Sequence, residues 1–346
     1  MFIFVEERMK ALSLTVVSLL ALCASSAAQE VTLRVHHFLP AQARIPAAAI
    51  TPWAEAVQEQ SDGRIAVELY PSMQLGGSPA SLFSQAQDGV VDVIWTVLGY
   101  TPGRFPKSEV FELPFVITNA EDSSVAFYNY VMENSADEFA NVHVLALHTH
   151  GPGLFHSRSP ITSLDDLTGL KVRGGSRIIS DMLARLGAEP VGMPVPETAE
   201  ALSRGVIDAT TSPWEVTPSL RIAELVSNHT GFSGEHGLYS QTFAFVMNRA
   251  TYDGLPEDLR AVIDANSGLE LSRSFGIAMD SGDLIGLEIA EQAGNSIVAL
   301  DEAETARWRE AAQPTIDNWI AEMDAAGNDG AALYAAAQEK VEEASR

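Results

Sequence analysis

The chain has 346 residues, and its 46 acidic side chains against 21 Lys and Arg give a formal charge of −25 at pH 7. This balance argues against a nucleic-acid partner, because neutralising phosphates requires surplus basic residues. It also means that an anionic ligand must be held by a local basic group, since the field of the whole protein repels it.

Residues 1–28 have the layout of a cleaved secretory signal. From Met9, a short basic region is followed by an apolar stretch and by small residues that end at Ala28, so we expect cleavage after Ala28. Either Met1 or Met9 is possible as the start. The apolar stretch is too short for a comfortable membrane span. We therefore expect an exported protein of the Gram-negative periplasm that is not itself membrane-spanning.

The only cysteine, Cys23, lies in this signal. The remaining 346 − 28 = 318 residues are enough for two lobes or one large domain. They contain no cysteine, which excludes thiol catalysis, thiolate metal sites and disulfides in the mature chain.

Strand-like and helix-like patterns alternate in the first half of the mature chain. Apolar alternation predicts strands, and amphipathic periodicity predicts helices. The expected order is a strand over 31–38, a helix over 46–60, a strand over 64–70, a helix over 79–88 and a strand over 90–97. This order is typical of a mostly parallel sheet covered by helices.

The same order recurs later, with a strand over 170–173, helices over 177–186 and 197–203, and a strand over 206–210. GVVD at 89–92 and GVID at 205–208 nearly repeat each other, and each follows a helix and opens an apolar strand. Pro71 and Met73, separated by one residue, precede the first of these helices, and the adjacent pair Met193 and Pro194 precedes the second. We infer two similarly built lobes.

Three further segments complete the expected fold. Residues 146–157 contain Gly-Pro-Gly and suit a crossing between the lobes. Residues 267–293 predict a long helix interrupted by glycines. The last 45 or so residues are rich in Ala and Glu and predict outer helices.

Arg173 is the strongest candidate for ligand binding. It ends a strand, Gly174 and Gly175 permit a tight turn, and Ser176 is a suitable N-cap for the next helix. Ligands of open α/β sheets bind at this edge, and helix N-termini favour anions. A guanidinium can hold a carboxylate in two parallel hydrogen bonds. Pairing of Arg173 with a neighbouring acid is the alternative.

Aromatic and polar residues follow one strand of each lobe. In the first lobe, Trp95 lies near the end of the strand over 90–97 and Tyr100 follows it; in the second, Ser212, Trp214 and Glu215 follow the strand over 206–210. Packing explains such tryptophans as well as recognition does, but two facing tryptophans would form an apolar slot for a small molecule.

Evidence for an enzyme is weak. The motifs G-x-S-x-G, G-x-x-x-x-G-K and G-x-G-x-x-G do not occur. His148, His150 and His156 resemble a metal cluster, but nothing nearby completes a ligand set, so we expect structural roles for them. A secreted metal-dependent hydrolase stays as a minor alternative. No catalytic residue, cofactor or metal is expected.

The motifs together resemble one known family. HHFLP, GRIAVELYPSMQLGG, DGVVDVIW, FELPF, DLTGLKVRGG, LGAEPVGMP, EALSRGVIDATTSPWE and LYSQTFAFVMN occur in the order found in DctP-type solute-binding proteins of TRAP transporters. The resemblance covers about 31–300.

This resemblance implies an α/β periplasmic-binding-protein fold with a cleft between two lobes and a long connecting helix. Lobe I would comprise 29–150 plus about 239–278, and lobe II 151–238 plus about 279–346. The protein would bind a small organic acid and deliver it to a TRAP permease with a small and a large integral membrane subunit. A ligand-binding module of a sensory system is the other alternative.

The resemblance also implies roles for individual residues. The G-L-K-[IVL]-R motif puts the carboxylate-holding arginine at Arg173, and a further ligand contact falls near Ser212. Gly151-Pro152-Gly153 stands where many relatives have a second arginine, which disfavours dicarboxylates and sialic-acid-like sugar acids. The Pro-Trp-Glu segment also departs from the asparagine-bearing version that is commoner in the family, which limits how far ligand preferences carry over.

The resulting hypothesis is a monocarboxylate site, with an aromatic acid favoured over a small hydroxy or keto acid. Arg173 and the amides of Gly174 and Gly175 would bind the carboxylate, and Trp95 and Trp214 would enclose the ligand body. Four side chains are candidates for reading hydroxyl or keto groups: His36, His37, Tyr100 and Glu215.

Overall fold

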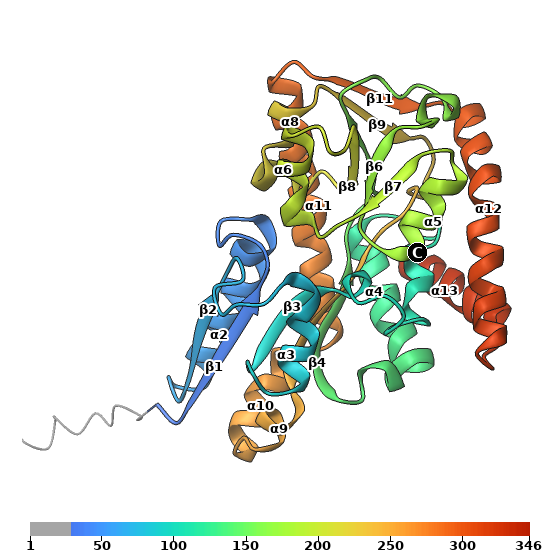
Figure 1. Cartoon of the computed structure of the whole chain (residues 1–346). Helices are drawn as coiled ribbons and strands as arrows, with labels where there is room; N and C mark the ends of the chain where they lie inside the picture. Colours follow the sequence, from blue (N-terminus) through green and yellow to red (C-terminus); the bar gives the residue numbers. More distant parts are fainter. Residues whose placement is uncertain (1–28) are drawn as a thin grey trace, which may run out of the picture.

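The computed structural model describes residues 29–346, which form two lobes, each built around a mixed sheet (Figure 1). The predicted signal segment, its cleavage site and Cys23 lie outside the described residues. Lobe I has the strand order β2-β1-β3-β10-β4, with β1 Val31–His37, β2 Ile65–Tyr70, β3 Val93–Val97, β4 Val142–Thr149 and β10 Thr242–Asn248.

Lobe II has the order β11-β9-β5-β8-β6-β7. Its strands are β5 Leu154–Ser157, β6 Lys171–Gly174, β7 Glu189–Gly192, β8 Ala209–Ser212, β9 Asn228–Phe232 and β11 Ser296–Leu300. The two-lobed α/β fold predicted from the sequence is confirmed.

Each sheet contains one strand that runs against the others, β10 in lobe I and β5 in lobe II. The chain enters β5 from lobe I through residues 150–153, and it returns through 233–241 into β10. Both strands therefore start at the cleft, whereas β1, β3, β4, β6 and β8 end there. Residues 146–157 do contain the crossing that the sequence predicted.

Helices cover the sheets, as the sequence patterns predicted. In lobe I these are α2 Thr51–Gln60, preceded by the π-helical turn η1 Pro46–Ile50, with α3 Leu82–Gln87, α4 Ala120–Tyr130, α9 Arg249–Asp253 and α10 Glu257–Ala265. In lobe II they are α5 Arg177–Arg185, α6 Thr198–Ser203, α7 Thr217–Leu220 and α8 Ile222–Leu225.

Two long helices connect the lobes. Helix α11, Leu269–Gln292, packs on α4 and β4 of lobe I and on α7 of lobe II (Figure 1). Helix α12, Glu302–Ala325, packs on α5, and Trp308 and Trp319 on it lie in the cores of lobe II and lobe I, respectively. The last helix, α13 Gly330–Ala344, packs on α4 of lobe I. The sequence-based assignment of all of 279–346 to lobe II differs from this placement.

The near-repeat of GVVD and GVID reflects a shared structural role. Asp92 Oδ2 accepts a hydrogen bond from the backbone N–H of Arg34 on β1, and Asp208 Oδ2 accepts one from Lys171 on β6, each at 3.0 Å. Gly89 and Gly205 have φ of +71° and +68°, a conformation that favours glycine. Corresponding strands of the two lobes are therefore joined in the same way.

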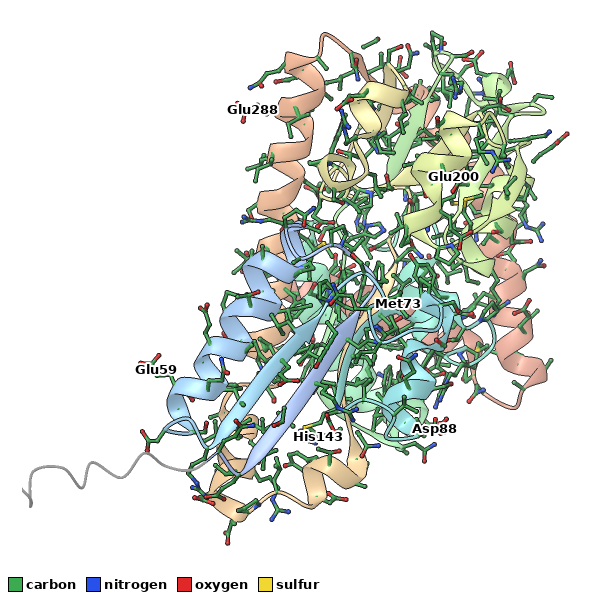
Figure 2. All side chains as sticks on the ribbon, turned by 60° about the vertical axis from the view of Figure 1, so that its left-hand side comes forward. Glu59, Met73, Asp88, His143, Glu200 and Glu288 are labelled. Atoms are coloured by element: carbon green, nitrogen blue, oxygen red, sulfur yellow. The ribbon has the colours of Figure 1, made fainter. Side chains whose placement is uncertain are left out.

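Acidic side chains lie on the surface of the molecule. Glu59 and Glu288 project from the outer faces of α2 and α11 (Figure 2), and both are exposed. In the described part of the chain, no helix combines the length and apolar character needed to cross a membrane.

Candidate ligand-binding site

A closed cavity lies between the lobes at the ends of the strands that meet at the cleft. Counted together with the solvent space that adjoins it, its empty volume is about 350 Å³. The lining comes from both lobes and from α11: Phe38, Leu39, Trp95, Val97, Tyr100, His150, Arg173, Val195, Ser212, Pro213, Glu215, Val216, Gln241, Phe243 and Met279. This is the edge of an α/β sheet at which small molecules bind.

Arg173 contributes a buried guanidinium to the cavity wall, and its side chain is 1% exposed. Its Nε donates to the carbonyl of Met193 at 3.0 Å, and its Nη1 donates to the carbonyl of Thr211 at 3.1 Å. These two bonds fix the plane of the guanidinium. Within residues 29–346, Nη2 has no hydrogen-bond partner. Two hydrogen bonds therefore hold the Arg173 side chain in place, and its Nη2 can still donate to a ligand. The alternative, in which Arg173 pairs with a neighbouring acidic side chain, is not what the structure shows.

The local sequence explains this position of Arg173. Strand β6 pairs with β8 in parallel register, which brings Arg173 opposite Thr210. Ser176 accepts a hydrogen bond from the backbone N–H of Ile179, so it is the N-cap of α5 as predicted. Lys171, two residues earlier on β6, is exposed.

Stacked aromatic rings form the lobe I wall of the cavity. Trp95 stacks on Phe38 with 4.8 Å between ring centroids, and it stacks on Phe243 with 5.4 Å. The indole Nε1 of Trp95 donates to Nε2 of His148 at 2.8 Å, which fixes the ring. Flat rings on this wall suit a flat, apolar ligand body.

His150 and Gln241 add a polar segment to the wall. Nε2 of His150 accepts from the backbone N–H of Gln241 at 3.0 Å, and Nδ1 of His150 bonds the Gly151 carbonyl. Burial, followed by the charge of Arg173, lowers the pKa of His150 to about 4, so this imidazole is neutral at pH 7. Its hydrogen bond positions Gln241 beside the cavity.

Glu215 is the one carboxyl group in the lining, and it is 5% exposed. Burial raises the pKa of Glu215 to about 8, and repulsion from Asp283 adds to the rise, while Arg44 opposes it. The carboxyl group is therefore mainly neutral at pH 7.

Four polar atoms of cavity-lining side chains lack a hydrogen-bond partner within the described residues. They are Arg173 Nη2, Ser212 Oγ, Glu215 Oε1 and Gln241 Nε2. A buried polar atom without a partner costs about 1–3 kcal/mol, so four in one cavity lining are unusual in a folded protein. A polar ligand that bonded to them would relieve this cost.

Five of the ten predicted site residues line the cavity: Arg173, Ser212, Glu215, Trp95 and Tyr100. Tyr100 also links the lobes, since its hydroxyl oxygen accepts from the backbone N–H of Val195 at 2.9 Å.

Trp214 does not line the cavity, so the predicted enclosure of a ligand between Trp95 and Trp214 is corrected. Its ring packs against His156 and His229, with centroids 5.0 Å and 4.8 Å away, and it borders a separate hollow. The reason is the direction of the chain after β8, where Pro213 faces the cavity and the next residue turns away.

His36, His37, Gly174 and Gly175 also lie outside the cavity lining. His36 Nδ1 and Gln85 Oε1 form a hydrogen bond of 2.7 Å, so the His36 side chain is bonded within lobe I. His37 lies edge-on to Trp95, behind the wall, with ring centroids 6.3 Å apart. The two glycines border a neighbouring groove, where Gly175 abuts the side chain of Gln241. Support of a carboxylate by their amides is not evident from this placement.

The three histidines of the apparent metal cluster have separate structural partners. His148 bonds Trp95, His150 bonds Gln241, and His156 Nδ1 lies 2.8 Å from Nδ1 of His229. Among residues 29–346, no group of three or more His, Cys, Asp or Glu side chains is arranged to hold a metal ion.

Several lining residues were not predicted from the sequence: Phe38, Leu39, Val97, His150 as a lining residue, Val195, Pro213, Val216, Gln241, Phe243 and Met279. Gln241 and Phe243 belong to the segment LYSQTFAFVMN, which marked the family but gave no indication of facing the ligand.

Fold and cavity together define a two-lobed solute-binding protein. The family model of bacterial extracellular solute-binding proteins, family 7 (DctP), matches residues 35–322. The chain belongs to this family, and it is a TRAP-type solute-binding protein, as the sequence motifs predicted.

Three solved structures show what the chain is similar to. A TRAP solute-binding protein from Rhodoferax ferrireducens T118, in complex with copurified benzoate, is 45% identical with a TM-score of 0.89, over 91% of this chain and 98% of that one. One from a marine metagenome, specific for aromatic acid ligands and in complex with 3-hydroxybenzoate, is 43% identical with a TM-score of 0.90, over 92% and 100%. One from Bordetella bronchiseptica, with bound (R)- and (S)-mandelate, is 30% identical with a TM-score of 0.83, over 90% and 99%.

Proposed function

We propose that this protein binds an aromatic monocarboxylate of the benzoate or phenylacetate type in the cavity between its lobes. The observation that carries the proposal is the opposition, within one closed cavity, of the unsatisfied Nη2 of Arg173 and a wall of stacked aromatic rings. A carboxylate needs the first feature, and a flat apolar body needs the second.

The carboxylate would accept hydrogen bonds from Arg173, with Ser212 and Gln241 as further donors. All three have a polar atom without a partner within residues 29–346. Exclusion of water from the closed cavity strengthens such charged hydrogen bonds, because the local dielectric is low.

Similar proteins support an aromatic ligand. The relatives solved with benzoate, 3-hydroxybenzoate and mandelate all hold a carboxylic acid with a six-membered aromatic ring.

The bound acid would be delivered, in the periplasm, to a TRAP permease with a small and a large membrane subunit. The closed arrangement of the lobes around the cavity supports this role, since a permease can then distinguish the liganded form from an open one.

Mass spectrometry of acids released from the gently purified protein tests the ligand class directly. We expect an aromatic acid, and calorimetry should then give tight binding of benzoates and phenylacetates. Tight binding of lactate or pyruvate, with no binding of any aromatic acid, would overturn the proposal in favour of small hydroxy or keto acids.

A further inference from the structure

Glu215 occupies an unusual position for a carboxyl group in a site for anions. It lies three residues after β8, and its side chain reaches the cavity wall. Helix α11 passes close behind it, because a Cβ atom at Gly282 would lie 2.6 Å from Cγ of Glu215. The glycine in α11 therefore makes room for this side chain, and Glu215 has little freedom to turn away.

The charged groups around Glu215 do not neutralise it by direct pairing. Asp283 Oδ1 accepts from the backbone N–H of Glu215 at 2.6 Å and brings a second carboxyl group close. Arg44 donates instead to α11, through Nε to the Ala278 carbonyl at 3.3 Å and through Nη2 to Ser281 Oγ at 2.6 Å. Oε1 of Glu215 is left without a partner within residues 29–346.

This environment favours the neutral form, in agreement with the pKa of about 8. A neutral carboxyl group both donates and accepts hydrogen bonds, whereas a carboxylate only accepts. An ionised Glu215 would also repel the carboxylate of the ligand. The neutral form is thus compatible with an anionic ligand and has a free donor and acceptor to offer it.

We propose that Glu215 is a specificity-determining residue, whose neutral carboxyl group hydrogen-bonds a hydroxyl substituent on the aromatic ring of the ligand. The stacked rings of Trp95, Phe38 and Phe243 offer no hydrogen bond, so a ring hydroxyl beside them needs a partner from elsewhere in the cavity lining. This inference rests on the proposed function, since it assumes an aromatic acid in the cavity.

Calorimetry with benzoate and with 2-, 3- and 4-hydroxybenzoate tests the proposal on the wild type, Glu215→Met and Glu215→Gln. We expect the wild type to prefer at least one hydroxybenzoate over benzoate. In Glu215→Met this preference should fall by about tenfold or more, because no hydrogen bond to the hydroxyl remains. In Glu215→Gln it should stay within about threefold, because the amide still donates and accepts. Circular dichroism and thermal melting of both variants, compared with the wild type, show that they fold.

The pH dependence provides a second measurement. The charged groups that act on Glu215 are Asp283 from α11 and Arg44 from the segment after β1. Arg173 and neutral His150 line the same cavity. Loss of the Glu215 proton places a negative charge beside the anionic ligand. Affinity should therefore be highest below pH 8 and fall above it by at most about tenfold per pH unit. Glu215→Gln should show a smaller fall.

The outcomes separate the two proposals. If the wild type binds none of these benzoates and no phenylacetate, both are overturned. If it binds them, but prefers no hydroxybenzoate or keeps its preference in Glu215→Met, only the role of Glu215 is overturned.

Discussion

Arg177 of lobe II pairs with Glu109 of lobe I across the entrance to the cleft. Its Nε donates to Oε1 of Glu109 at 2.7 Å, and its Nη2 bonds the other oxygen of the same carboxylate. Its Nη1 donates to Glu322 of α12 at 2.7 Å. Glu109 lies in the 3₁₀ turn η4, Ser108–Glu112, and is 6% exposed. This bidentate pair exists only while the lobes are closed in this way.

Arg177→Ala should therefore weaken ligand binding by destabilising the closed form. The arginine side chain is 31% exposed, so we expect a modest loss of about 1 kcal/mol, or about fivefold in affinity. Calorimetry with the bound acid measures the affinity, and small-angle scattering measures the closure. Arg185→Ala, which breaks an exposed pair with Asp181 on the same helix, is the control and should change neither. Equal affinities in the two variants would exclude a role for Arg177 in closure.

Arg173→Ala should weaken binding by roughly 30-fold to several thousand-fold, because removing one partner of a buried charged hydrogen bond costs about 2–5 kcal/mol. Arg173→Lys should also bind weakly, since an ammonium does not reproduce the planar fork. Lys171→Ala, on the same strand but exposed, is the matched control. Calorimetric binding of Arg173→Ala within a few-fold of the wild type would remove Arg173 from carboxylate binding.

The two tryptophans near the cleft should respond differently to the ligand. Trp95 lines the cavity and Trp214 does not. A fluorescence titration with an aromatic acid should therefore give its full signal in Trp214→Phe, with the dissociation constant within about twofold of the wild type. In Trp95→Phe most of the signal should disappear. The reverse result would show that Trp214 contacts the ligand.

Gly286→Ala should lower stability, although Gly→Ala in an exposed helix usually raises it. A Cβ atom at position 286 would lie 2.1 Å from the carbonyl oxygen of Trp214, so α11 would have to move away from lobe II. Overpacking of this kind costs about 1–3 kcal/mol, which corresponds to several degrees in Tm. Calorimetric melting measures the change, with Leu284→Ala, 69% exposed on the same helix, as the control. An unchanged or higher Tm for Gly286→Ala would contradict this close contact.

Much of the fold could be predicted from local patterns. Apolar alternation identified β1, β2, β3, β6 and β8, and helical periodicity identified α2, α5 and α11. The near-repeat of GVVD and GVID indicated two similar lobes, because the same Gly and Asp contacts recur in each. The position of β10 could not be predicted this way. Its place between β3 and β4 depends on contacts far apart in the chain, and no local pattern encodes them.

Local sequence patterns likewise predict only part of the candidate site. Arg173 and Ser212 could be predicted, because the ends of parallel strands meet at one edge of the sheet. Gln241 and Phe243 could not, because β10 runs the other way and contributes its start to the cleft. The error at Trp214 has a similar origin, since strand alternation ends at Ser212 and gives no direction for the residues after it.

The insertion of β10 between β3 and β4 of the lobe I sheet limits the order in which the two lobes of this protein can be completed during synthesis. The segment that completes the sheet begins 242 − 149 = 93 residues after β4 ends, with five of the six strands of lobe II between them. A chain that emerges from its N-terminus onward therefore cannot finish the sheet of its first lobe before most strands of the second have been made. Neither half can be exchanged as a single stretch of gene, and a truncation before residue 242 leaves β4 without a neighbour in its sheet.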